Sequence, residues 1–138
     1  MKRLFVARRN FPQDNMTINY SETSEFARDF KKLLKKFPSL NDDMDIIKKF
    51  RIELFHIQKI DNESIFEIER VGNGENLRFY KIKKFQCKSL KGRGSKSGMR
   101  VIYAFHCQSC KVDFIEIYFK GEQENEDRER IKEYLKNC

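Results

Sequence analysis

The hydrophobic period of the sequence changes near Ile65, and this change constrains the fold more than any other feature. Before it, apolar residues recur at helical spacing, which predicts two amphipathic helices over residues 24–37 and 40–56. After it, apolar and polar residues alternate in short segments, as in half-buried strands. Helices followed by strands indicate an α+β domain, with the helices packed on one face of a mostly antiparallel sheet.

The two helices are expected to form an antiparallel hairpin. Pro38 ends the first, because a residue that precedes proline is disfavoured in helical geometry. Ser24 and Asn41 are the expected N-caps. We interpret the apolar stripes of both helices as core that packs on the sheet.

The sheet is expected to have four strands or more, preceded by an N-terminal strand and followed by a short C-terminal helix capped by Asn125. One face of this sheet should remain free for function. The expected strands cover residues 16–20, 65–71, 77–87, 99–106 and 111–119, and the final helix lies within 125–137.

Alternation along the last strand sorts its side chains onto two faces. An aliphatic set should meet the helices, and a set that carries a carboxylate and a phenol should point away. The first set is Ile115, Ile117 and Phe119, and the second is Phe114, Glu116 and Tyr118.

Basic residues gather in the middle of the chain. The 138 residues carry a formal net charge of +8, and no acid interrupts the cations between Asn76 and Val112, whereas acids concentrate within Gly121–Glu129. This segregation favours a polyanion-binding surface, and the plain alternative is a solvated basic face. The cations are Arg78, Lys81, Lys83, Lys84, Lys88, Lys91, Arg93, Lys96, Arg100 and Lys111.

Arg100 stands at the start of a strand, directly after the glycine-rich loop of Lys88–Gly98. We expect its side chain to point away from the helices, because a buried unpaired guanidinium is costly. At that place it can bind a phosphate through two parallel hydrogen bonds. The loop glycines let the backbone approach a nucleic acid closely.

The sequence predicts one cytoplasmic domain that does not cross a membrane, since it shows no secretory signal and no apolar run of about 18 residues. Its cysteines, Cys87, Cys107, Cys110 and Cys138, are expected to be reduced thiols. A zinc site at Cys107 and Cys110 with His106 and Cys87 is the alternative, but a second Cys-x-x-Cys is missing, so we expect neither metal nor cofactor.

The strand "GMRVIYAF" resembles the Gly-x-Arg-Val-Ile-Tyr strand of the RelE/ParE superfamily of toxins, and "SEFARDFKKLLKKFPSL" resembles its first helix. The expected order of elements is similar too, over roughly Met16 to Leu135. The resemblance implies a toxin domain over residues 16–138. Residues 1–15 are then an extension or precede the true start at Met16, and an extra strand at "RLFVA" is the competing interpretation.

The RelE branch implies metal-independent cleavage of mRNA on the ribosome, in which the ribose 2′-OH attacks the adjacent phosphate. Arg100 matches the family arginine and would stabilise the transition state. Lys83 and Lys84 lie where the family places catalytic lysines, and like-charge crowding could lower a lysine pKa enough for it to act as a base. Tyr118 and Lys120 are the nearest candidates for two further roles at the site, orientation of the nucleophile and contact with the phosphate, respectively. The implied RNA-binding residues are Lys81, Lys88, Lys91, Arg93 and Lys96.

The resemblance also implies partners: a cognate antitoxin that wraps the basic groove, the ribosome and mRNA. Two other functions remain open. One is ParE-like inhibition of DNA gyrase, and the other is noncatalytic binding of nucleic acid by a domain of the same fold.

Overall fold

The computed structural model describes residues 17–61, 63–90, 92, 94 and 96–138. The expectations about residues 1–15, Met16, Lys91 and Arg93 lie outside these residues. In chain order the elements are β2 (Asn19–Glu22), α1 (Ser24–Lys36), α2 (Leu40–Ile47), the π-helical stretch η2 (Lys48–Ile52), α3 (Glu53–His56), β3 (Ile65–Glu67), β4 (Leu77–Ile82), β5 (Met99–His106), β6 (Lys111–Phe119) and α4 (Arg128–Lys136).

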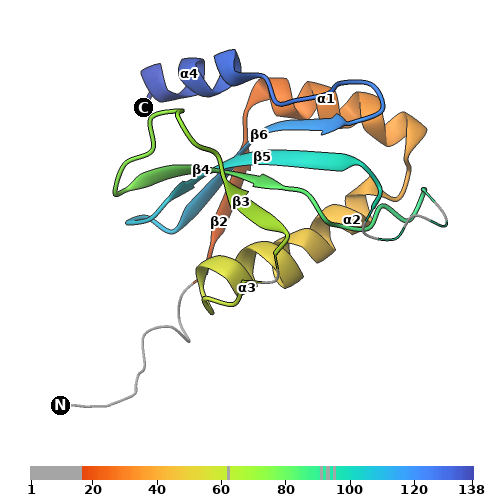
Figure 1. The fold of residues 1–138 in the computed structure, drawn as a ribbon, viewed down its shortest axis with the longest axis horizontal. Coiled ribbons are helices and arrows are strands. Elements are labelled where there is room, and N and C mark those ends of the chain that lie inside the picture. Colours follow the sequence, from red (N-terminus) through yellow and green to blue (C-terminus); the bar gives the residue numbers. More distant parts are fainter. Residues whose placement is uncertain (1–16, 62, 91, 93, 95) are drawn as a thin grey trace.

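The strands form one five-stranded sheet in the order β2-β6-β5-β4-β3 (Figure 1). β2 runs parallel to β6, and the other neighbours are antiparallel. The α+β class and the mostly antiparallel sheet are therefore confirmed. No helix within the described residues is both long and apolar enough to cross a bilayer.

The first helix of the hairpin forms where the apolar spacing predicts it, and it buries Phe26 and Leu33. Its cap is Thr23 rather than Ser24, because the Thr23 hydroxyl accepts a hydrogen bond from the Phe26 amide at 3.1 Å. The second helix begins at Leu40, one residue before the expected cap at Asn41. The cap residues therefore lie one or two positions earlier than the sequence indicated.

The second helix contains a π-helical stretch between α2 and α3. Here the Glu53 amide donates to the Lys48 carbonyl, five residues back, instead of the usual four. The Tyr20 hydroxyl, on β2, donates to the same carbonyl at 3.3 Å and to the Glu53 carboxylate at 3.0 Å. These bonds tie the centre of the helix to the edge of the sheet.

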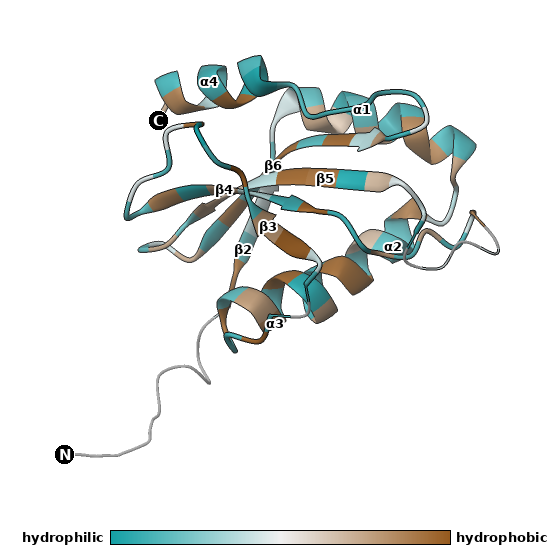
Figure 2. Cartoon of the chain, in the orientation of Figure 1, coloured by the Kyte–Doolittle hydropathy of each residue, from teal (hydrophilic) through white to brown (hydrophobic). Residues whose placement is uncertain are grey.

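Both faces of the sheet are covered, which corrects the expectation of a free face. Figure 1 shows α4 on one side of the sheet and α2 with α3 on the other. Figure 2 shows brown, apolar stretches along β5, between these layers. Ile131 of α4 is fully buried against Phe79 and Ile102, whereas Tyr103 lies in the larger core beneath the hairpin. The α4 side of the sheet is therefore accessible where α4 and its preceding segment leave it uncovered.

A bulge in β6 breaks the expected alternation. Tyr103 pairs with Phe114, but Ile102 pairs with Glu116, so Ile115 is an extra residue. Phe114 consequently belongs to the core beneath the hairpin, and Ile115 belongs to the core beneath α4. The expected placement of these two residues was wrong, because a bulge reverses the parity of every position before it.

Candidate nucleic-acid interface

One row of side chains crosses the α4 side of the sheet near its end. Strand pairing aligns Phe66 of β3 with Lys81 of β4, Lys81 with Ile102 of β5, and Ile102 with Glu116 of β6. Because paired residues present their side chains on the same face, this row places an aromatic ring, an amine and a carboxylate on one face of the sheet.

Arg100 lies two residues before Ile102 and is paired with Tyr118. Alternation along β5 directs Val101 into the core beneath the hairpin, and Arg100 to the opposite face, as expected. The Arg100 guanidinium is partly exposed and donates to the Lys83 carbonyl at 3.4 Å and to the Met99 carbonyl at 3.1 Å. These bonds hold the side chain beside Lys83 and leave part of its donor fork for a ligand.

Lys83 has a lowered pKa. Partial burial disfavours its charged form first, and the positive charges of Lys81, Arg100 and Lys120 lower the pKa further. We call these four residues the cation cluster. Lys83 consequently loses its proton more readily than an ordinary lysine, because its pKa is lowered.

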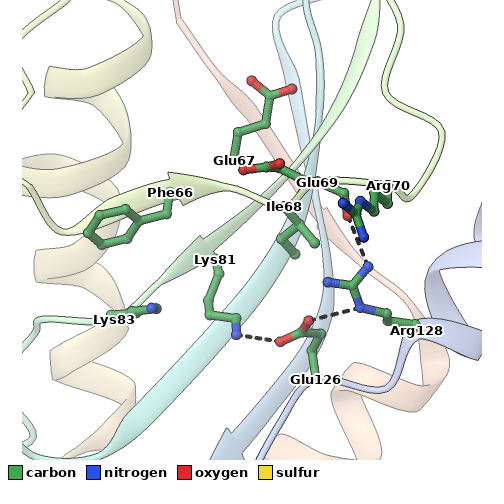
Figure 3. A pocket seen from close by; sticks show the side chains of 9 residues that line it. All are labelled: Phe66, Glu67, Ile68, Glu69, Arg70, Lys81, Lys83, Glu126 and Arg128. Atoms are coloured by element: carbon green, nitrogen blue, oxygen red, sulfur yellow. Dashed lines mark hydrogen bonds and ion pairs between the residues drawn. The ribbon is translucent and has the colours of Figure 1, made fainter.

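A carboxylate lies inside this positive region. Figure 3 shows Glu126 between Lys81 and Arg128, with an ion pair to each. The Glu126 side chain is only 7% exposed. Burial alone would raise its pKa, but the hydrogen bond and charge of Lys81, with the charge of Arg128, lower the pKa overall. Glu126 is therefore an anion that neutralises part of the cation cluster.

Glu116 holds the segment that carries Glu126 in place. Its buried carboxylate accepts hydrogen bonds from the Asp127 amide at 2.8 Å and from the Gln123 side chain at 2.7 Å. Burial raises the pKa of Glu116, and the two hydrogen bonds offset part of that effect. The sequence placed Glu116 on the correct face but gave no sign that the chain folds back over it.

Tyr118 and Lys120 flank Arg100 but differ in accessibility. The Tyr118 ring is 4% exposed, and burial, followed by the charge of Glu126, raises its pKa to about 12. Lys120 is exposed, and its amide donates to the Gly98 carbonyl at 2.8 Å, at the start of β5. The Lys120 side chain can therefore contact a ligand, whereas the Tyr118 side chain is buried beside Arg100.

The remaining predicted cations are less closely grouped. β4 ends at Ile82, so Lys83 and Lys84 follow the strand instead of lying within it, and Lys84 is exposed. Lys88 is exposed as well, and its amide donates to the Asp43 carboxylate at 3.2 Å, which anchors the loop to α2. Lys96 is also exposed, in a bridge with Phe85.

A shallow hollow of about 370 Å³ opens beside the cation cluster. Phe66, Lys81 and Lys83 line it together with Glu126 and Arg128 (Figure 3). The sequence analysis gave Phe66 no role, although alternation from the buried Ile65 already places it on the face that carries Lys81. Glu67, Glu69 and Arg70 line it as well, so the hollow combines charges of both signs with an exposed aromatic ring.

The histidines have structural positions. His56 is buried, stacks on Phe105 and forms a 2.7 Å hydrogen bond with the Tyr103 hydroxyl. Burial, with the nearby charge of Lys59, lowers the pKa of His56 to about 3, so its imidazole is neutral near pH 7. His106 lies at the far end of β5 and forms a 2.6 Å hydrogen bond with Tyr134.

The four cysteines are free thiols, and Cys87 lies buried at 3.7 Å from the Ser39 hydroxyl. Within the described part of the chain, no group of three or more histidine, cysteine or acidic side chains could hold a metal ion.

No protein-family profile matches the sequence, and no curated protein matches it. The structure is similar to a chain in the crystal structure of an archaeal RelE–RelB complex from Pyrococcus horikoshii OT3, with a TM-score of 0.45 and 17% sequence identity. The match covers 77% of this chain and 98% of that chain. A likeness of this extent assigns neither a reaction nor a partner to the present chain.

Proposed function

We propose that the chain is the toxin of a type II toxin–antitoxin module and cleaves mRNA on the ribosome. The observation that carries the proposal is the convergence of Lys81, Lys83, Arg100 and Lys120 at one end of the sheet. A polyanion relieves the mutual repulsion of such a cluster, and a phosphate is the group that the donor fork of Arg100 fits best.

The proposed reaction is transfer of the phosphate to the neighbouring 2′-oxygen. Lys83 in its neutral form accepts the 2′-OH proton, the 2′-oxygen bonds to phosphorus, and the bond to the 5′-oxygen breaks. Arg100 stabilises the charge on the pentavalent phosphorus, and Lys120 donates a proton to the leaving oxygen. The products are a 2′,3′-cyclic phosphate and a 5′-OH.

The solvent exposure of the neighbouring side chains suggests their supporting roles in the proposed reaction. Tyr118, buried next to Arg100, is a positioning residue for the guanidinium. Lys84, Lys88 and Lys96 are exposed and would bind phosphates farther along the strand. The partner expected in the resting cell is an antitoxin segment that becomes ordered as it covers the cations.

The test uses purified protein with ribosomes and a translated mRNA. Arg100→Ala and Lys83→Ala should each reduce cleavage about 100-fold or more, because each removes a group that acts in the transition state. Arg28→Ala is the matched control, because Arg28 is an exposed cation on α1. Equal cleavage by Arg100→Ala and the control would contradict the proposed role of the cluster.

A further inference from the structure

We propose that Phe66 is a stacking platform for one base of single-stranded RNA, next to the phosphate held by the cation cluster. This inference rests on the proposed function and names a contact with the substrate that the function alone does not require.

The first argument is the exposure of Phe66. Its side chain is 39% exposed, and the other exposed large hydrophobic residues among the described ones are Ile46, Phe50 and Ile60. Of these four, Phe66 is the one that lines the hollow beside the cations. A single exposed ring is ordinary by itself, so the argument rests on its place in the hollow beside Lys81 and Lys83.

The second argument is the placement of the ring relative to charge. Phe66 is paired directly with Lys81, and the Lys83 amine lies over its ring, 5.1 Å from the centroid. Figure 3 shows the ring and the Lys83 amine side by side in the hollow. A nucleotide whose base lies on the ring would therefore have its phosphate within reach of Lys83.

The third argument concerns the class of ligand. Every base has a flat π face, and stacking on an aromatic side chain accepts any sequence. Bases in a duplex already stack on one another and are not free to lie on a side chain. Single-stranded RNA, whose bases can be splayed out, fits both the ring and the cations.

The test exploits the absence of tryptophan from the chain. Phe66→Trp introduces a single indole, whose fluorescence should fall when a base stacks on it. Phe50→Trp is the matched control, because Phe50 is also exposed and has the Lys49 amine over its ring at 5.6 Å, but it lies on η2, away from the hollow. The ligands are a labelled 2′-O-methyl RNA, which lacks the attacking hydroxyl, and inorganic polyphosphate, which has no base.

We expect the RNA to quench Phe66→Trp and not Phe50→Trp, and polyphosphate to bind without quenching either variant. In the same assay, Phe66→Ala should weaken RNA binding about 10-fold and leave polyphosphate binding unchanged. The anisotropy of the labelled RNA reports binding independently of the indole.

RNA binding without quenching of Phe66→Trp would overturn the platform, and so would equal quenching by polyphosphate. If mRNA cleavage also depends on Arg100, the proposed nuclease would stand while the platform falls. The opposite pattern, with quenching but no Arg100-dependent cleavage, would retain the base site and overturn the nuclease. Failure of both ligands to bind would overturn the platform, and the nuclease would then stand or fall with Arg100-dependent cleavage of translated mRNA.

Discussion

At the scale of single residues, Glu126 sets the electrostatic state of the cation cluster. It pairs with Lys81 and Arg128, and its charge raises the pKa of Lys83, in opposition to the neighbouring cations. The Glu126 carboxylate is paired with the Lys81 amine, which a phosphate could otherwise contact. In the proposed function, RNA would therefore compete with an internal anion for Lys81.

Replacement of Glu126 by Gln should strengthen binding of polyanions and lower the pKa of Lys83 further. Because the proposed base acts in its deprotonated form, the rising limb of the plot of kcat/KM against pH should move to lower pH. Glu122→Gln removes the same charge from an exposed pair with Lys36 and serves as the control. An equal displacement of the limb in both variants would show that Glu126 has no special relation to Lys83.

At the scale of elements, the hydrophobic period predicts what depends on local spacing. The hairpin helices, the presence of the strands and the inward face of α4, with Ile131, follow from apolar residues at a period of 3.6 or 2. The bounds differ: β2 begins three residues later than expected, β3 and β4 end four and five residues earlier, and Asp127 rather than Asn125 caps α4. Arg100 was placed correctly because its strand, β5, contains no extra residue before Val101, so simple alternation applies.

What depends on tertiary contacts was not predictable. The bulge at Ile115 has no signature in the alternation, and the π-helical stretch depends on Tyr20, which is distant in sequence. Residues 121–127 fold back over the sheet, where the buried Glu116 carboxylate accepts hydrogen bonds from the Gln123 side chain and the Asp127 amide. The sequence could therefore place the cations at one end of the sheet, but not the anion that is folded among them.

The cap of α1 provides a test at this scale. Thr23→Ala should lower the free energy of unfolding by about 1 kcal/mol, because the Phe26 amide loses its acceptor. Ser24→Ala, at the cap position that the sequence indicated, should change it by no more than a few tenths of a kcal/mol. Urea denaturation of both variants decides between the two caps, and a larger loss for Ser24→Ala would contradict the observed geometry.

At the scale of the whole molecule, the sheet is buried on both faces, and the open polar surface lies at one end of it. Beneath the hairpin, the His56 ring is buried against Phe105 and Tyr103, and the fold keeps this imidazole neutral. This makes the stability of the entire domain depend on pH.

The pKa of His56 is about 3 in the folded state, against 6.5 for the free side chain, so the unfolded chain binds its proton first as the pH falls. From this group the free energy of unfolding should fall by about 1.4 kcal/mol per pH unit between roughly pH 6 and pH 3. His56→Gln should flatten that slope in urea denaturation. An unchanged slope in His56→Gln would contradict a buried neutral imidazole.

The central claim, that the cation cluster cleaves translated mRNA, is tested most directly by mapping 5′-OH ends of cellular mRNA after induction of the chain in a bacterial host. We predict new ends within translated frames for the unaltered chain and for Arg28→Ala, and none for Arg100→Ala. Growth arrest without new ends would contradict the claim and favour gyrase inhibition, and ends that persist in Arg100→Ala would contradict the role assigned to the cluster.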